Sequence, residues 1–279
     1  MPEGDTIYKA AAALRSLLVG QTILAAGART PGPMIERVVG SRVEQITTSG
    51  KHLTVHFDNG LALHTHLRMG GAWHRYRPGE RWLRPPSQAR VVLEVPEHVV
   101  VLFNAPVAEL VSERALERHP SLTRLGPDLL APVFDADQAL RRLTTRSRDL
   151  PLGEALLDQQ ALAGVGNVYK SEILFLEQLD PWTRVSELDE ARLRSVLGMA
   201  ERLLRANVQA GAPRITTTDS SVRSPVWVYG RAGRPCFRCR GRIHVRRHGD
   251  PPRLTYWCPT CQSPAASRPA PGSSRTAGR

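Results

Sequence analysis

The chain has 279 residues, enough for about two domains, and its 41 % hydrophobic content is ordinary for a globular protein. Its net charge of +12 favours a polyanionic partner, and nucleic acid is preferred over a membrane surface because no basic amphipathic helix or lipidation signal is evident. No apolar run approaches the roughly 18–20 residues of a membrane span and the acidic start is unlike an export signal, so we expect a cytoplasmic protein.

The first predicted element is an amphipathic helix over residues 5–18, which Asp5 can cap. Ahead of it, Pro2 is small enough to favour removal of Met1, which would leave a secondary amine beside Glu3. An α-amino group titrates at about 7.7–8.0. Its uncharged form can add to the C1′ carbon of a sugar to form an iminium, with Glu3 as a proton donor. The alternative is an ordinary start with acidic residues at a helix N-terminus.

Between about residues 22 and 110 the sequence changes to short β-rich segments separated by turns, and Asp58–Gly60 has the composition of a hairpin turn. This spacing predicts a sandwich or a barrel. The clearest strands are expected at 43–47, 52–57, 61–67, 89–95 and 99–103.

Lysine is scarce: only Lys9, Lys51 and Lys170 accompany 35 arginines. Genomic base composition explains most of this bias. The three lysines still merit attention, because an ammonium group can transfer protons that an always-charged guanidinium does not.

After about residue 112 the sequence becomes mainly helical, with a helical period over 191–210 and two helical segments within 153–178. Residues 162–167 join these two segments, and Gly164 and Gly166 permit a sharp turn and a close approach of the backbone to a ligand. The start of the second helix then offers free N–H groups suited to one phosphate. A plain turn between packed helices explains the same residues.

Near the C-terminus, two Cys-x2-Cys pairs separated by eighteen residues match a four-thiolate zinc site, with Cys236, Cys239, Cys258 and Cys261 as ligands. Four thiolates leave no open position for a catalytic water, so the ion is expected to be structural. Residues 242–247 and 253–257 are expected to form a hairpin. Eight arginines accompany a single acid, Asp250, in this segment, which favours a phosphate-binding element over a merely solvated basic face.

Five motifs in this order resemble the formamidopyrimidine-DNA glycosylase and endonuclease VIII family of base-excision repair enzymes. They are Pro2-Glu3-Gly4, Ser49-Gly50-Lys51-His52-Leu53, His66-Leu67-Arg68-Met69-Gly70, the segment from Leu162 to Tyr169, and the cysteine segment. The resemblance covers the chain from Met1 to Gln262 and leaves only the tail outside.

The resemblance implies an α+β fold. An N-terminal β-sandwich with flanking helices is expected over 1–115, and a helix–two-turns–helix DNA-binding domain over 116–226. A zinc-finger β-hairpin is expected over 227–262, followed by a disordered tail over 263–279.

The resemblance also implies roles for four catalytic residues. Pro2 would be the Schiff-base nucleophile, and Glu3 the proton donor that opens the sugar ring. Lys51 would donate a proton in β-elimination. Arg253 would grip the phosphate beside the lesion and take part in δ-elimination.

Four further residues are implied to contact DNA: Arg68, Met69, Arg124 and Asn167. A base inside a duplex is reached only after its nucleotide rotates out of the stack, and Met69 is a flexible apolar wedge able to fill the vacated space. A place in the core is the alternative for Met69.

Two departures from the family pattern favour an endonuclease VIII-like enzyme of actinobacterial type, acting on oxidised pyrimidines. The 8-oxoguanine enzymes carry an Arg and a Phe beside the wedge methionine, in an Asp-Pro-Arg-Arg-Phe-like run. The corresponding segment here, Phe103-Asn104-Ala105-Pro106-Val107, contains no Arg and does not end in Phe, and the loop before residues 226–230 is short. Against this, endonuclease VIII has Leu and Tyr at the positions of Met69 and Gly70.

We therefore predict a bifunctional glycosylase and abasic-site lyase, with damaged DNA and one zinc ion as its partners, acting as a monomer at the nucleoid. A non-catalytic damaged-DNA-binding zinc protein is the alternative. An RNA-associated zinc protein suits the charge but not the N-terminal residues.

Overall fold

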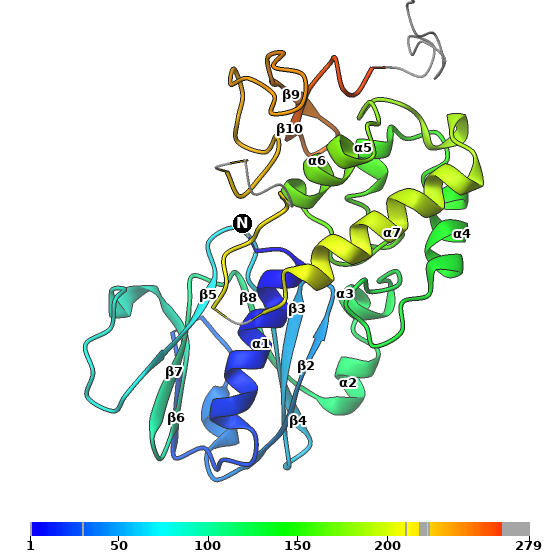
Figure 1. The fold of residues 1–279 in the computed structure, drawn as a ribbon. Coiled ribbons are helices and arrows are strands. Elements are labelled where there is room, and N and C mark those ends of the chain that lie inside the picture. The colour runs from blue at the N-terminus through cyan, green and yellow to red at the C-terminus, as the bar shows by residue number, and fades with distance from the viewer. Residues whose placement is uncertain (1, 30, 210, 218–221, 223, 264–279) are drawn as a thin grey trace, which may run out of the picture.

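The computed structural model describes residues 2–29, 31–209, 211–217, 222 and 224–263, and the N-terminal part of the chain forms two facing antiparallel sheets (Figure 1). Each sheet has four strands. The first has the order β1 (Ala25–Ala28), β6 (Ala89–Val95), β7 (His98–Phe103), β5 (Ala72–Tyr76). The second has the order β2 (Val43–Ser49), β3 (His52–Phe57), β4 (Leu61–His66), β8 (Val107–Ser112). The predicted β-sandwich is confirmed.

Helix α1 (Gly4–Leu18) packs its apolar face into the core of this sandwich. Ile7, Ala11, Leu14 and Leu18 are buried there, as the helical period of the sequence predicts. The expected hairpin turn over 58–60 joins β3 to β4. The five predicted strands are present, whereas β1, β5 and β8 were not singled out from the sequence.

The second core is helical, and Figure 1 shows α7 crossing beside α4 and α6. Its helices are α4 (Ala136–Arg146), α5 (Leu152–Ala155), α6 (Asn167–Leu176) and α7 (Glu190–Ala206). Two short helices precede them in the chain: α2 (Glu113–Glu117), which packs on β4 and β8, and α3 (Pro120–Thr123), which contacts α2. Three 3₁₀ turns, η1 (Ile35–Val38), η2 (Pro86–Gln88) and η3 (Val185–Glu187), complete the helices. The first helix expected within 153–178 is only a single turn, because Asp158 folds back and accepts the Gln160 N–H at 2.9 Å.

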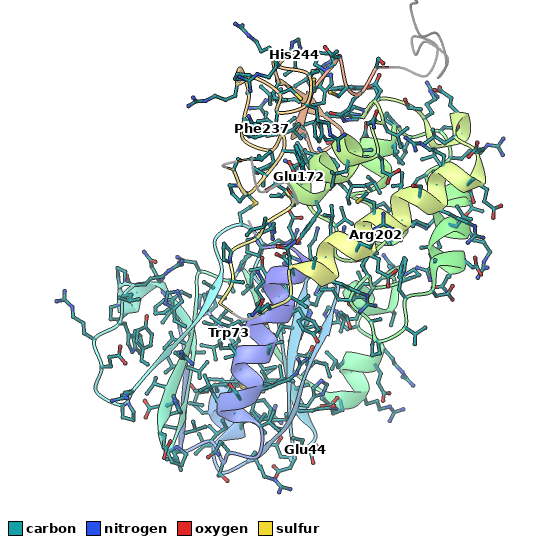
Figure 2. All side chains as sticks on the ribbon, in the orientation of Figure 1. Glu44, Trp73, Glu172, Arg202, Phe237 and His244 are labelled. Carbon is teal, nitrogen blue, oxygen red and sulfur yellow. The ribbon has the colours of Figure 1, made fainter. Side chains whose placement is uncertain are left out.

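The C-terminal hairpin consists of β9 (His244–His248) and β10 (Arg253–Trp257), as predicted, and β10 packs on α6. Glu172, labelled in Figure 2, ties α6 to the segment before the hairpin. Its carboxylate accepts the N–H groups of Trp227, Val228 and Tyr229. The predicted disordered tail lies outside the described residues, except for Ser263. Within the part of the chain that is described, no helix has the length and apolarity to cross a bilayer.

Candidate active site

A pocket of about 280 Å³ lies where the start of α1, the β2–β3 turn, the loop after β4, the start of α6 and β10 meet. It brings together seven of the eight residues that the sequence implicates in catalysis or DNA contact; Arg124 is outside it. The lining residues are Pro2, Glu3, Lys51, His66, Arg68, Met69, Leu157, Gln159, Gly166, Asn167 and Arg253.

Glu3 is fully buried at the bottom of this pocket, and its carboxylate is held by the N-terminus of α6. It accepts the N–H groups of Gly166 at 2.9 Å, Val168 at 2.8 Å and Tyr169 at 3.3 Å. These are the N–H groups that the sequence suggested for a phosphate, and that expectation is wrong because a carboxylate of the same chain already occupies them. A Cβ atom on Gly166 would overlap the Glu3 carboxyl group, which explains the glycine.

Burial raises the pKa of Glu3. Nearby Arg214 and Lys51, and the N–H groups of Val168 and Tyr169, act in the opposite direction. A carboxyl group balanced in this way suits a proton donor, since its protonated form is less costly than it would be in water.

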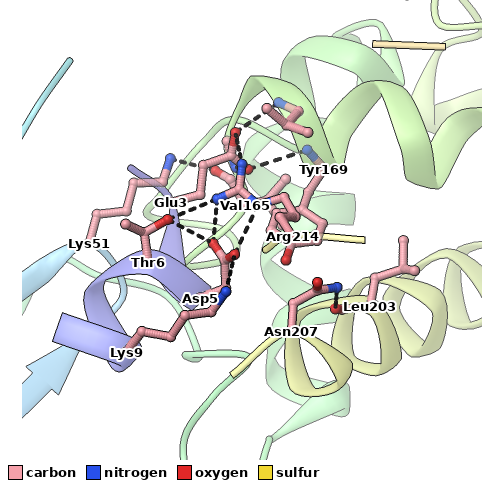
Figure 3. Close-up of polar contacts among 12 residues, drawn as sticks. Glu3, Asp5, Thr6, Lys9, Lys51, Val165, Tyr169, Leu203, Asn207 and Arg214 are labelled. Carbon is pink, nitrogen blue, oxygen red and sulfur yellow. Dashed lines mark hydrogen bonds and ion pairs between the residues drawn. The ribbon is translucent and has the colours of Figure 1, made fainter. Parts of the chain in front are cut away.

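Asp5 does not cap α1, contrary to the expectation, because Glu3 holds the N-cap position and Asp5 turns toward the segment after α7. There Arg214 grips it through two nitrogens, with Nε at 2.9 Å and Nη2 at 2.5 Å from the two carboxylate oxygens. Arg214 also lies 3.9 Å from the Glu3 carboxylate and above the Tyr169 ring. Figure 3 shows this guanidinium between the first turn of α1 and α6. One largely buried guanidinium thus faces two buried carboxylates, and Lys9 adds a second cation 3.9 Å from Asp5.

Lys51 sits on the turn between β2 and β3 and donates from Nζ to the Val165 carbonyl oxygen at 2.5 Å (Figure 3). The turn is tied to the helical part, because the Gly50 N–H donates to the Asp128 carboxylate at 2.8 Å. Gly50 has a φ of +57°, a conformation that glycine adopts without strain. Burial lowers the pKa of Lys51 to about 8, with Glu3 opposing the shift. A lysine with this pKa exchanges protons near neutral pH.

The outer edge of the pocket is exposed and cationic. Met69 is 65 % exposed on the loop after β4, which rules out a place in the core. Arg68 beside it has a left-handed backbone with a φ of +50°. Arg253, at the start of β10, is exposed on the opposite side of the pocket. Arg84, from the loop before β6, donates to the Gly70 carbonyl oxygen at 3.3 Å and adds a cation next to Met69.

Asn167 and Arg124 occupy different settings. Asn167, the first residue of α6, is buried and donates from Nδ2 to the Leu254 carbonyl oxygen at 2.8 Å, which joins α6 to β10. Lys170, one turn further along, is buried and donates to Thr255 Oγ1 at 2.7 Å. Arg124 is exposed at the end of α3.

The four cysteine sulfurs converge as the spacing predicts. All lie within 4.8 Å of one another, with 3.8 Å between Cys236 and Cys261 and 3.4 Å between Cys239 and Cys258. Sulfurs bound to one tetrahedral zinc at about 2.3 Å would be about 3.8 Å apart. The cluster therefore fits one zinc ion with little rearrangement.

Sequence reasoning missed Arg214, Asp128 and Gln159. Gln159 shapes the 162–166 turn by accepting the Gly164 N–H at 3.2 Å and donating to the Val165 carbonyl oxygen at 3.0 Å. Nothing local marks Arg214 among so many arginines, since the two carboxylates it faces, those of Glu3 and Asp5, are more than 200 residues away. Asp128 ends the segment Arg124-Leu125-Gly126-Pro127-Asp128, which also contains Arg124, so its position near a residue that the resemblance implicates was a usable signal.

Two family models match the chain. One, for the formamidopyrimidine-DNA glycosylase N-terminal domain, matches residues 1–107, and the other, for the formamidopyrimidine-DNA glycosylase H2TH domain, matches 125–219. Among solved structures, MutM in complex with carbocyclic 8-oxo-G-containing DNA has a TM-score of 0.80 at 22 % identity, and covers 94 % of this chain and 100 % of its own. The Lactococcus lactis Fpg in complex with abasic-site DNA has a TM-score of 0.79 at 21 % identity with the same coverage. These two structures establish the shared fold.

Curated relatives are more similar in sequence. A probable endonuclease 8 2 of Streptomyces coelicolor is 42 % identical over 96 % of both chains. The DNA-(apurinic or apyrimidinic site) lyase Nei2 of Mycolicibacterium smegmatis is 38 % identical over 94 % of this chain and 99 % of its own. An endonuclease 8 of Escherichia coli is 31 % identical over 94 % of this chain and 100 % of its own. The chain therefore belongs to the formamidopyrimidine-DNA glycosylase and endonuclease VIII family.

Proposed function

We propose that this protein is a bifunctional DNA glycosylase and abasic-site lyase that works through the amine of Pro2. The observation that carries the proposal is the single pocket that Pro2 shares with Glu3 and Lys51. Relatives named endonuclease 8 and DNA-(apurinic or apyrimidinic site) lyase support it, at 42 % and 38 % identity.

In the proposed reaction the uncharged Pro2 nitrogen attacks C1′ of the damaged nucleotide, the bond from C1′ to the base breaks, and the departing base takes up the proton that the Pro2 nitrogen loses. Glu3 donates a proton to the sugar ring oxygen, which opens the ring and leaves an iminium between Pro2 and C1′. Water then takes a C2′ proton, a C2′–C3′ double bond forms, and the C3′–O3′ bond breaks so that the 3′ strand leaves as a phosphate, with Lys51 as the proton donor to that phosphate. A second elimination breaks the C5′–O5′ bond. Water finally hydrolyses the iminium and frees the amine.

The exposed edge of the pocket is proposed to hold the DNA. Arg68 and Arg253 would contact phosphates from opposite sides, and Met69 would fill the space left by the rotated nucleotide. Asn167 and Arg124 would add contacts from the helical part. Such a set positions the strand without reading its sequence, which suits an enzyme that meets damage in any context.

The remaining assignments follow the same family. Cys236, Cys239, Cys258 and Cys261 would hold one structural zinc ion that fixes the hairpin and so places Arg253. We propose functional units at 1–115, 116–226 and 227–262, acting as a monomer on DNA at the nucleoid in the cytoplasm. Oxidised pyrimidines are the proposed substrates, because segment 103–107 contains no Arg and ends in Val107 rather than in the Phe expected of an 8-oxoguanine enzyme.

Borohydride trapping on an abasic duplex tests the nucleophile. Protein whose chain begins at Pro2 should give a covalent adduct, and the same protein with a permanent N-terminal tag should give none. The matched control carries a removable tag whose cleavage exposes Pro2, and trapping should return after cleavage. No adduct from untagged protein, or equal trapping with the tag in place, would leave only the alternative of a non-catalytic damage binder.

Excision from matched duplexes tests the substrate. Thymine glycol and 5-hydroxyuracil should be removed faster than 8-oxoguanine under single-turnover conditions. Rapid 8-oxoguanine removal with negligible pyrimidine removal would overturn the preference and leave the nucleophile untouched.

A further inference from the structure

A second group of metal-ligating side chains lies outside the pocket, where the second sheet meets the first helices of the helical part. His64 lies on β4, Glu109 on β8, and His119 immediately before α3. One ligand atom from each lies within 4.8 Å of the others. The proposed function makes no use of these three residues.

The three side chains converge on a single oxygen. Glu109 Oε2 lies 3.2 Å from His64 Nδ1 and 3.1 Å from His119 Nε2. Ligands bound to one tetrahedral ion at about 2.0–2.1 Å are about 3.3 Å apart. Two edges of a coordination tetrahedron are therefore already in place, and the two imidazole nitrogens that form the third edge lie within 4.8 Å of each other.

The surroundings meet the further needs of such a site. Metal-bound histidines commonly hydrogen-bond through their other nitrogen, and His64 Nε2 lies 2.9 Å from His52 Nδ1. The ring of His64 is 1 % exposed and cannot swing away, whereas the Glu109 side chain is 47 % exposed and leaves a way in for an ion. The group is thus rigid on one side and open on the other.

The same contacts also form without an ion, if both imidazoles carry a proton toward Glu109. His119 Nδ1 accepts the Ser121 N–H at a long 3.3 Å. Binding an ion through Nε2 places the ring proton on Nδ1 and gives up this hydrogen bond. Losing this long hydrogen bond costs little compared with the three metal–ligand bonds that form. The group with the ion and the group without it therefore have nearly the same geometry.

We propose that His64, Glu109 and His119 form a second metal site that takes a divalent transition ion such as Zn²⁺ while leaving coordination positions open. Two imidazoles and one carboxylate suit zinc, cobalt or nickel, whereas magnesium and calcium prefer oxygen ligands. The ion links β4 and β8 of the sandwich to the residue before α3. It thereby stiffens the connection between the sandwich and the helical part.

Zinc titration of the full chain, with the four-cysteine site already loaded, tests the proposal. Calorimetry should show one additional zinc per chain in the wild type. His119→Gln and Glu109→Gln should each weaken this second binding at least tenfold, and atomic emission should show that the first zinc is kept. His98→Gln, at the start of β7 on the other sheet, is the matched control and should bind as the wild type does.

Failure of the zinc titration can be told apart from failure of borohydride trapping, because neither His119→Gln nor Glu109→Gln changes a residue that lines the pocket. A wild type that binds only the zinc of the cysteine site overturns the proposal and leaves a hydrogen-bond network. Second-site binding that survives in either variant overturns it as well, since the ion then sits elsewhere. Glu109→Gln still accepts hydrogen bonds from both imidazoles, so it guards against a result caused by misfolding.

Discussion

The floor of the pocket (Glu3, Lys51 and Asn167) and its rim (Arg68, Met69 and Arg253) are built on opposite principles. Each floor side chain is held by hydrogen bonds to backbone groups from a distant part of the chain. The rim residues are exposed, and Met69 projects an apolar side chain into solvent. The floor is therefore organised before any ligand arrives, whereas the rim is shaped for a partner that supplies its contacts. Changes at the floor should therefore alter the chemistry or the stability of the protein, whereas changes at the DNA-contacting surface should alter DNA binding.

Glu3→Gln removes the proton donor at the floor. An amide cannot supply a proton to the ring oxygen, so single-turnover excision of an oxidised pyrimidine should fall by about 10²–10⁴-fold. DNA affinity at the rim should be unchanged in a filter-binding assay. An excision rate within threefold of the wild type would contradict the role of Glu3.

Arg214→Gln leaves the Asp5 and Glu3 carboxylates without their shared cation. Removing one partner of a buried ion pair costs about 3–5 kcal/mol in the free energy of unfolding, which urea titration measures. Adding Asp5→Asn should restore part of that loss. Arg194→Gln, which breaks an exposed pair with Asp137, should have no measurable effect and serves as the comparison.

Gly166→Ala pushes a methyl group into the Glu3 carboxyl group without changing any charge. We expect a loss of about 1–3 kcal/mol in the free energy of unfolding and a lower excision rate. Gly27→Ala, on β1, meets no atom within 4 Å and should leave both unchanged. If Gly166→Ala and Gly27→Ala had the same free energy of unfolding and the same excision rate, the Glu3 carboxyl group would be shown to tolerate displacement.

Lys51 should give the strand-cleavage reaction a descending limb at high pH. Its pKa is lowered to about 8, so the protonated donor becomes the minority form above that value, and kcat/KM on abasic DNA should fall about tenfold per pH unit beyond it. Lys51→Arg stays charged throughout this range, so its slower reaction should lack the limb. A limb that persists in Lys51→Arg would assign it to another group.

Arg124→Ala should have the smallest effect and should act only through charge. If Arg124 contacts one phosphate, the slope of log K against log salt should decrease in size by about 0.9, with excision in the bound complex unaltered. Arg37→Ala is the matched control, because its carbonyl contacts Asn59 at the end of β3 far from Lys51. Equal slopes for the two variants would remove Arg124 from the DNA surface.

Most of the fold was predictable because its signals are local. The apolar face of α1, the β-rich segments separated by turns that become β2, β3 and β4, and the cysteine spacing are each contained in short stretches of sequence. The residues that form the floor of the pocket were predictable from the sequence, but the groups that hold them in place were not. Glu3 was identified from its motif, yet the helix end that binds its carboxylate lies 163 residues further along the chain. No local pattern distinguishes a helix N-terminus that binds a carboxylate of the same chain from one that binds a phosphate. Arg214 was missed for the same reason.

The hydrogen bonds between the Glu3 carboxylate and the start of α6 also determine when the pocket can form during protein synthesis. A ribosome adds about 5–20 residues per second, so roughly 10–30 s separate the synthesis of Glu3 from that of Gly166. During this interval the helix end that holds the Glu3 carboxylate does not yet exist. The nascent chain therefore carries its amine without an organised floor around it, and we expect the ability to process DNA to appear only after the helical part has been made and has docked.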